Sequence, residues 1–151
     1  MITFWSYLTV FGMSALPIIE LKGSIPVGMS MGIPELQCFI VAIFGSMILS
    51  PFIIVLTRRV LDKFMNSKIS WLQRFGKWQH KRLLIKGGKI EKYRVWFLFI
   101  FVAIPLPSTG VWTGSMIAGL FDIRLRNALP AIFLGNCVAG LCIWLIWGFA
   151  M

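Results

Sequence analysis

Uncharged residues gather in four stretches of the sequence, at 1–19, 36–57, 95–121 and 127–151. A membrane-spanning helix needs about 20 consecutive, mainly apolar residues. The stretches 36–57 and 127–151 meet this length without a charge, so each is predicted to be a helix that crosses a membrane. The other two need a different interpretation, because prolines and glycines interrupt or follow them.

The stretch 95–121 contains Pro105 and Pro107 near its middle. Proline removes a backbone donor and clashes with the preceding helical turn. At membrane depth, freed backbone groups are tolerated only where protein or a water-filled cavity covers them. We therefore predict a re-entrant hairpin with limbs at 95–104 and 111–121, which enters the membrane and returns to the same side.

Residues 1–34 are predicted to form another hairpin, which enters from the opposite side and has its apex near Pro17 to Pro26. In the alternative topology, 1–19 crosses the membrane completely and the amino terminus is cytoplasmic. Since 1–19 lacks a basic start and a small-residue cleavage site, we expect it to remain in the mature protein.

The order of a hairpin followed by a span occurs twice, and short sequence matches accompany it. Residues 15–17 match 103–105, and residues 42–46 match 131–136. Because the two hairpins enter from opposite sides, the repeats are predicted to be inverted, a plan common among transporters. The predicted fold class is an all-α polytopic membrane protein with one membrane domain over 1–151, divided into repeat 1 at 1–57, a basic amphipathic linker at 58–94 and repeat 2 at 95–151.

Composition and charge support this interpretation. Hydrophobic residues make up 58% of the chain and charged residues 13%, whereas a soluble domain carries about 25% charged residues. The formal net charge of +10 comes wholly from 58–94, where twelve Lys and Arg stand against two acids. By the positive-inside rule this block is cytoplasmic, which indicates a multi-pass protein of the cytoplasmic (inner) membrane. A nucleic-acid-binding protein would not lack charge over such long stretches, so nucleic acid is excluded as a partner.

Within the basic block, apolar side chains recur every three or four residues from Val60 to Trp78. This pattern predicts an amphipathic helix over much of 60–86, lying in the inner interface of the membrane. Anionic lipid headgroups are the expected partners of its lysines and arginines.

Two charges lie in the interrupted first region, at Glu20 and Lys22. Charges at membrane depth are expensive and commonly mark substrate or proton pathways. Burial disfavours the charged form of a carboxylate, which suits proton coupling or cation binding, so Glu20 is the leading candidate. Lys22 would share a cavity with Glu20 only on a broken segment, where it could hold an anionic headgroup or act as the counter-ion. The competing interpretations are an interfacial pair of the two residues and a lysine that reaches to the surface.

The second hairpin offers hydroxyl groups and an indole after its prolines. The hydroxyls either line a site or satisfy backbone groups that the prolines free, and Trp112 either packs or forms a wall for an organic substrate. Gly110 and Gly114 would allow the backbone of this hairpin to approach the opposite hairpin closely. The candidate substrate- or ion-binding residues are the polar and helix-breaking residues of both hairpins: Glu20, Lys22, Pro26, Pro105, Pro107, Ser108, Thr109, Trp112 and Thr113.

Metal and enzyme chemistry find little support in the sequence. Cys38, Cys137 and Cys142 lie in apolar runs without CxxC spacing, and His80 is the only histidine. We therefore expect no metal and no cofactor. We also expect no enzymatic activity, because no nucleophile–base or metal-ligating constellation is present.

The segments 20–28 (ELKGSIPVG) and 103–114 (AIPLPSTGVWTG) resemble the two signature stretches of the small multidrug export protein family, which is related to the DedA-type membrane proteins. The resemblance covers most of the chain and implies two facing re-entrant hairpins in a small inner-membrane transporter. For DedA relatives it implies a lipid-linked phosphate substrate, such as a polyprenyl-phosphate carrier, moved with protons or sodium. Those relatives carry arginines beside the second hairpin's proline, whereas the flanks of Pro105 are apolar or hydroxylic here. A phosphate would lack its natural bidentate partners, which leaves a cationic or neutral amphiphile open as substrate.

Together these features predict a transporter, coupled to protons or sodium, that moves an amphipathic organic or lipid-linked substrate through a site between the hairpins. An uncoupled lipid scramblase or flippase of the same fold is one alternative. A non-transporting membrane assembly protein, in which the basic segment is the working part, is another. A chain this small often needs a second copy to enclose a pathway, so a homo-oligomer is also considered.

Overall fold

The structure is a computed structural model that describes residues 4–66, 88–106 and 109–150, together with Ser70, Arg74 and Lys77. The helices, in chain order, are α1 (Phe4–Ala15), α2 (Glu20–Ser30), α3 (Glu35–Met47), α4 (Ser50–Met65), α6 (Gly88–Ala103), α7 (Val111–Leu120) and α8 (Leu125–Ala150). The predicted all-α fold class is confirmed for these described residues.

Two helical stretches, Glu35–Phe64 and Leu125–Ile146, are long and apolar enough to cross a membrane. They coincide with the two spans predicted from the uncharged stretches. The first is not one regular helix, because α3 ends at Met47 and α4 starts again with Pro51 in its first turn. The ring of a proline clashes with the carbonyl four residues earlier. For Pro51 that residue is Met47, which explains where α3 stops.

The two hairpins differ in how closely they follow the sequence prediction. In the second, α6 ends at Ala103 and α7 begins at Val111, close to the predicted limbs. In the first, the turn is confined to residues 16–19, and Pro26 lies inside α2 instead of near the apex. A proline inside a helix removes one backbone hydrogen bond. Packing of α2 against α1 and α3 keeps the helix continuous through that position.

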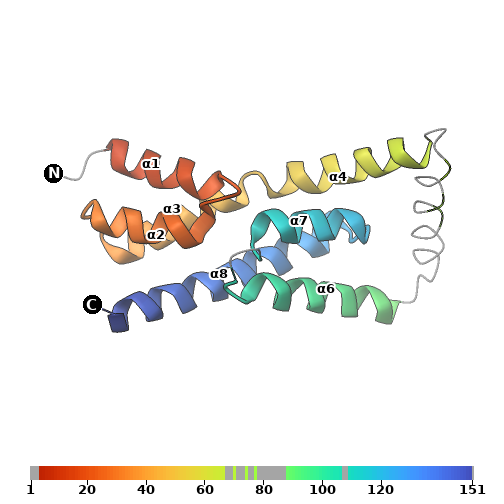
Figure 1. The fold of residues 1–151 in the computed structure, drawn as a ribbon. Coiled ribbons are helices and arrows are strands. Elements are labelled where there is room, and N and C mark those ends of the chain that lie inside the picture. The colour runs from red at the N-terminus through yellow and green to blue at the C-terminus, as the bar shows by residue number, and fades with distance from the viewer. Residues whose placement is uncertain are drawn as a thin grey trace.

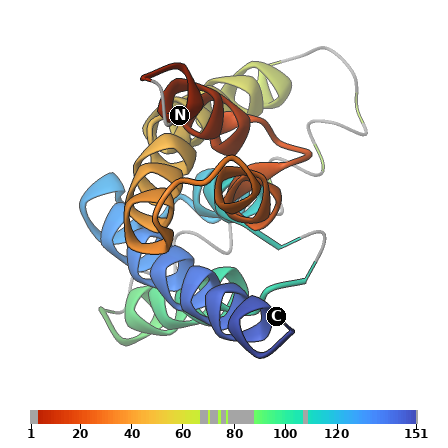
Figure 2. The same cartoon turned by 90° about the vertical axis from the view of Figure 1, so that its left-hand side faces the viewer.

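The hairpins lie end to end in the molecule. Figure 1 shows the turn between α1 and α2 and the turn between α6 and α7 both near the middle, with the hairpins extending toward opposite ends. Seen from one end, α2 and α7 lie one behind the other along the centre, with the other helices around them (Figure 2). The first turns of α2 and α7 therefore face each other across the middle of the molecule.

Two apolar clusters form the core, and each takes residues from both 1–57 and 95–151. One cluster centres on Ile25 of α2, and the other is shared by α4, α6, α7 and α8. Buried polar contacts also join these two segments, and the side-chain amide of Asn136 donates to the Ser46 hydroxyl at 2.7 Å. The Ser50 and Ser115 hydroxyls lie 2.7 Å apart, so α3 and α4 are tied to α8 and α7.

The amphipathic segment predicted over 60–86 falls mostly outside the described residues. Its beginning continues α4 to Met65. Beyond that helix, Ser70, Arg74 and Lys77 are helical and exposed.

The contact between α6 and α8 yields a test of the packing. A Cβ at Gly135 would stand 2.8 Å from the Phe99 carbonyl oxygen and 2.9 Å from Cβ of Val102. We expect Gly135→Ala to push α8 away from α6 and to cost about 1–3 kcal/mol of stability. Gly12→Ala is the matched control, because nothing lies within 4 Å of a Cβ there and alanine favours a helix interior over glycine by about 0.5–1 kcal/mol. Thermal unfolding in detergent measures both variants, and equal Tm values would contradict this packing.

Candidate functional site

Glu20 occupies a strained and buried position at the turn of the first hairpin. It begins α2 with a left-handed φ of 45°, a conformation that costs a residue with a side chain roughly 1–2 kcal/mol. The residue is only 9% exposed. Its Oε1 accepts a hydrogen bond from the backbone N–H of Trp112 at 3.2 Å. Strain of this kind persists only where surrounding contacts hold it, commonly at functional sites.

The Glu20 carboxylate stands at the first turns of two helices. Glu20 belongs to the first turn of α2, and Trp112 to the first turn of α7. The N–H groups at a helix start lack helical partners and carry partial positive charge. Both helix starts thus favour a negative charge at this point. In transporters, half-helix starts of this kind receive an anionic group of the substrate, and here the protein's own carboxylate takes that place.

Gly110 gives the carboxylate its space. A Cβ at Gly110 would stand 1.8 Å from Oε2 of Glu20. The backbone at Gly110 is extended, with φ −179°, so any residue could adopt its conformation. Glycine is therefore favoured here by the close approach of the opposite hairpin.

Lys22 satisfies the broken backbone of the second hairpin. Its Nζ donates hydrogen bonds to the carbonyl oxygens of Leu106 and Thr109, which lie in the turn between α6 and α7. The Thr109 hydroxyl forms two more hydrogen bonds within the same turn. It accepts from the Leu106 N–H at 3.1 Å and donates to the Ile104 carbonyl.

Trp112 of the second hairpin also contacts the first hairpin. Its indole Nε1 donates to the carbonyl oxygen of Ala15 at 2.9 Å. Ala15 is the last residue of α1, so its carbonyl is one of those that a helix end leaves without a helical partner. Each hairpin thus supplies side chains that satisfy backbone groups freed at the turn of the other.

The structure brings together four of the predicted site residues, namely Glu20, Lys22, Thr109 and Trp112. Of the other described candidates, Pro26 is inside α2, Pro105 is exposed in the turn that Lys22 contacts, and Thr113 is half-buried next to Trp112 on α7. Pro107 and Ser108 lie outside the described residues.

Three further features of the site are now clear. For Thr109, the geometry matches the backbone-satisfying role. The prediction of close approach to the opposite hairpin is confirmed for Gly110 and wrong for Gly114, whose missing Cβ would meet Val102 of its own hairpin at 2.5 Å. The carbonyls of Ala15 and Leu106 were not foreseen as partners. Their positions at helix ends beside a proline break were the available signal.

The matched family model is described as "Putative small multi-drug export protein" and covers residues 20–142. The chain belongs to the small multidrug export protein family. No curated protein and no solved structure gave a match. Family membership and the two long apolar helices agree on a membrane protein. The family match begins at Glu20 and includes the residues of the hydrogen bonds described above between the two hairpins, except Ala15.

The contact between Glu20 and Gly110 can be measured by a double-mutant cycle. Gly110→Ala should destabilise the protein by about 1–3 kcal/mol, because the methyl group displaces the carboxylate. In a Glu20→Gly background, where the carboxylate is absent and glycine adopts a positive φ freely, the same change should cost much less. Thermal unfolding of the four proteins gives the coupling energy. Additive losses would show that the two residues do not touch.

Proposed function

We propose that this small multidrug export protein is an ion-coupled transporter of the cytoplasmic membrane, with its substrate site between the two hairpins. It moves an amphipathic organic or lipid-linked substrate, and Glu20 is the coupling group. One observation carries the proposal: a strained, buried carboxylate of one hairpin holds the first turn of the other hairpin. Charged groups in such positions commonly serve transport.

The lengths of the short helices support re-entrant hairpins. The helices α1, α2 and α7 have 12, 11 and 10 residues. At about 1.5 Å per residue each is ~15–18 Å long, roughly half of a hydrocarbon core of about 30 Å. The turns also present apolar side chains, with Ile18 94% and Leu106 52% exposed. Apolar side chains at the turns suit the middle of a membrane, where neighbouring protein must cover the irregular backbone.

Contacts at the basic end support the orientation of the second hairpin. Arg58 of α4 pairs with Asp122 at 3.4 Å, and Arg124 pairs with Glu91 at 3.8 Å. These pairs hold the turn between α7 and α8 against the middle of α4 and against the start of α6. With the basic end cytoplasmic, the basic residues of α4 and α6 obey the positive-inside rule.

Matching local geometry supports the inverted repeat. The turn after α2 and the turn after α7 each contain a residue with positive φ, Gly32 and Asp122. In each turn the next residue donates its N–H five positions back, from Ile33 to Gly28 and from Ile123 to Ala118. These pairs are 90 positions apart, as are Ser46 and Asn136, which contact each other directly. Equivalent residues meet in this way on a local two-fold axis.

The mechanism follows from the charge of Glu20. While the carboxylate is ionised, its hydrogen bond to the Trp112 N–H is charge-assisted, and such bonds are about twice as strong as neutral ones. Protonation, or a cation bound at the carboxylate, removes that advantage and weakens the contact between the hairpins. The hairpins can then separate and admit a substrate between their turns. Separation also requires Lys22 of the first hairpin to release the carbonyl oxygens of Leu106 and Thr109.

Cysteine labelling tests the topology. In a variant in which Cys38, Cys137 and Cys142 are replaced by alanine, we expect Trp5→Cys and Met31→Cys to react with a membrane-impermeant maleimide from the outside. Phe121→Cys should react only from the cytoplasmic side. All three positions are exposed. If 1–19 crosses the membrane completely, Trp5→Cys will instead be labelled from the cytoplasm.

Flux through liposomes tests the coupling role. We expect Glu20→Gln to abolish the stimulation of transport by a pH or sodium gradient, with a loss of at least about tenfold, because the amide cannot take up a proton or bind a cation. The probes are an amphipathic cation and a polyprenyl phosphate, each with and without the gradient. Glu35→Gln is the matched control, because Glu35 lies at the start of α3 and accepts from the Trp144 indole, away from the hairpin turns.

The outcomes separate the proposal from its alternatives. Normal gradient-driven transport by Glu20→Gln at every pH would reject the coupling role. Lipid flipping without any gradient, and without regard to headgroup, would instead identify a scramblase. An assembly protein is favoured by two results together. Neither probe is transported, and neutralising the basic residues of 60–86 abolishes the protein's activity in cells.

A further inference from the structure

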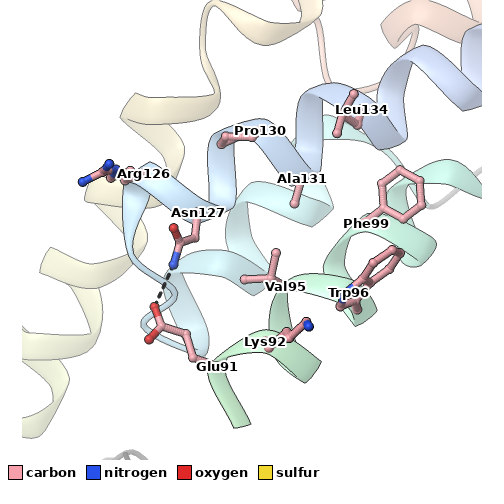
Figure 3. Close-up of a pocket in the computed structure, with 10 residues that line it drawn as sticks. All are labelled: Glu91, Lys92, Val95, Trp96, Phe99, Arg126, Asn127, Pro130, Ala131 and Leu134. Carbon is pink, nitrogen blue, oxygen red and sulfur yellow. Dashed lines mark hydrogen bonds between the residues drawn. The ribbon is translucent and has the colours of Figure 1, made fainter. Parts of the chain in front are cut away.

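A groove of about 510 Å³ lies between α6 and α8, apart from the hairpin turns. This volume falls within the range of about 300–1,000 Å³ that is typical of small-molecule sites. Figure 3 shows Val95, Trp96 and Phe99 of α6 along one side, with Ala131 and Leu134 of α8 on the other. Trp96 is 55% and Leu134 is 55% exposed, so the apolar part of the groove is open from the side of the molecule.

The polar end of the groove carries a surplus of positive charge. Lys92 on α6 and Arg126 on α8 border that end from opposite sides, with the Arg126 side chain directed outward, and both are exposed (Figure 3). The acid in the lining, Glu91, accepts from the Asn127 amide at 3.0 Å and pairs with Arg124. Glu91 is therefore already neutralised, which leaves the charges of Lys92 and Arg126 for an occupant.

The charge and the apolar surface are ordered along the groove as in a lipid molecule. Both helices begin at the basic end, and both lead from charged residues to apolar ones, Lys92 to Phe99 on α6 and Arg126 to Leu134 on α8. The lining residues of α6 extend over eight positions, from Glu91 to Phe99, which is about 12 Å along the helix. One leaflet of the hydrocarbon core is about 15 Å deep. A headgroup at the charged end would thus lead one acyl chain along the apolar part.

We propose that this groove binds an anionic phospholipid of the inner leaflet, with the phosphate between Lys92 and Arg126 and one acyl chain against Trp96, Phe99 and Leu134. Basic pockets between membrane helices on the cytoplasmic side are suited to anionic headgroups. This site is separate from the contact of Glu20 with the second hairpin and does not depend on the transport proposal.

Lipid binding by the delipidated, full-length protein in detergent tests the site. Native mass spectrometry should show phosphatidylglycerol bound about tenfold more tightly than phosphatidylcholine, because two cations attract the anionic headgroup. Lys92→Gln combined with Arg126→Gln should remove this preference. Leu134→Trp should weaken binding by filling the apolar part, without a change of charge. Phosphatidylglycerol with brominated chains should quench less fluorescence in Trp96→Phe than in the unmodified protein.

Matched controls keep the result specific. Arg59→Gln combined with Lys63→Gln removes the same charge from exposed positions on α4 and should leave the preference intact. Equal binding of phosphatidylcholine, equal loss in the α4 control, or binding of free glycerol phosphate as tight as that of the lipid would each overturn the proposal. A dimer that buries the groove and excludes lipid would overturn it as well. No transport is measured, so failure of the Glu20 hypothesis would not affect this result.

Discussion

The structure depends on how two interruptions of helical backbone are satisfied away from water. A helix that stops inside the molecule leaves N–H and carbonyl groups without partners, and each such group is costly in an apolar medium. Here the two interruptions lie together and satisfy each other. Lys22 donates to the carbonyls of Leu106 and Thr109, Glu20 accepts from the Trp112 N–H, and the Trp112 indole donates to Ala15. Neither hairpin could end where it does without the other.

This reciprocity explains why the only two charges of the first hairpin lie where they do. A structural role for Glu20 and Lys22 does not compete with a role in transport, because the bonds that close the site are the bonds that a transport cycle must open. The carboxylate is the group of the pair whose bond depends on its ionisation. The ammonium of Lys22 holds two carbonyls of the second hairpin whatever the state of the carboxylate, so its bonds must be released in addition before the turns can part.

Much of the fold could be predicted from the sequence because helices and their ends are local. Uncharged stretches located the two long apolar helices, and the prolines near 105 located the second turn. Two prolines show what the sequence could not decide. Packing keeps α2 helical through Pro26, whereas Pro51 coincides with the end of α3. The sequence singled out Glu20, Lys22, Thr109 and Trp112 by residue type. Their partners could not be predicted, because each inter-hairpin contact joins residues more than 80 positions apart.

The distribution of charge along one helix connects the two ends of the molecule. The basic residues that give the chain its net charge of +10 continue into the first turns of α6, where Lys92 borders the groove. The same helix ends at Ala103, directly before the turn that Lys22 holds. Gly135 of α8 lies against the Phe99 carbonyl near that end, so α6 cannot shift along its length without disturbing α8. In the proposed topology, the charged start of α6 would fix its depth at the membrane interface, and that depth would set where the second hairpin turn meets the first.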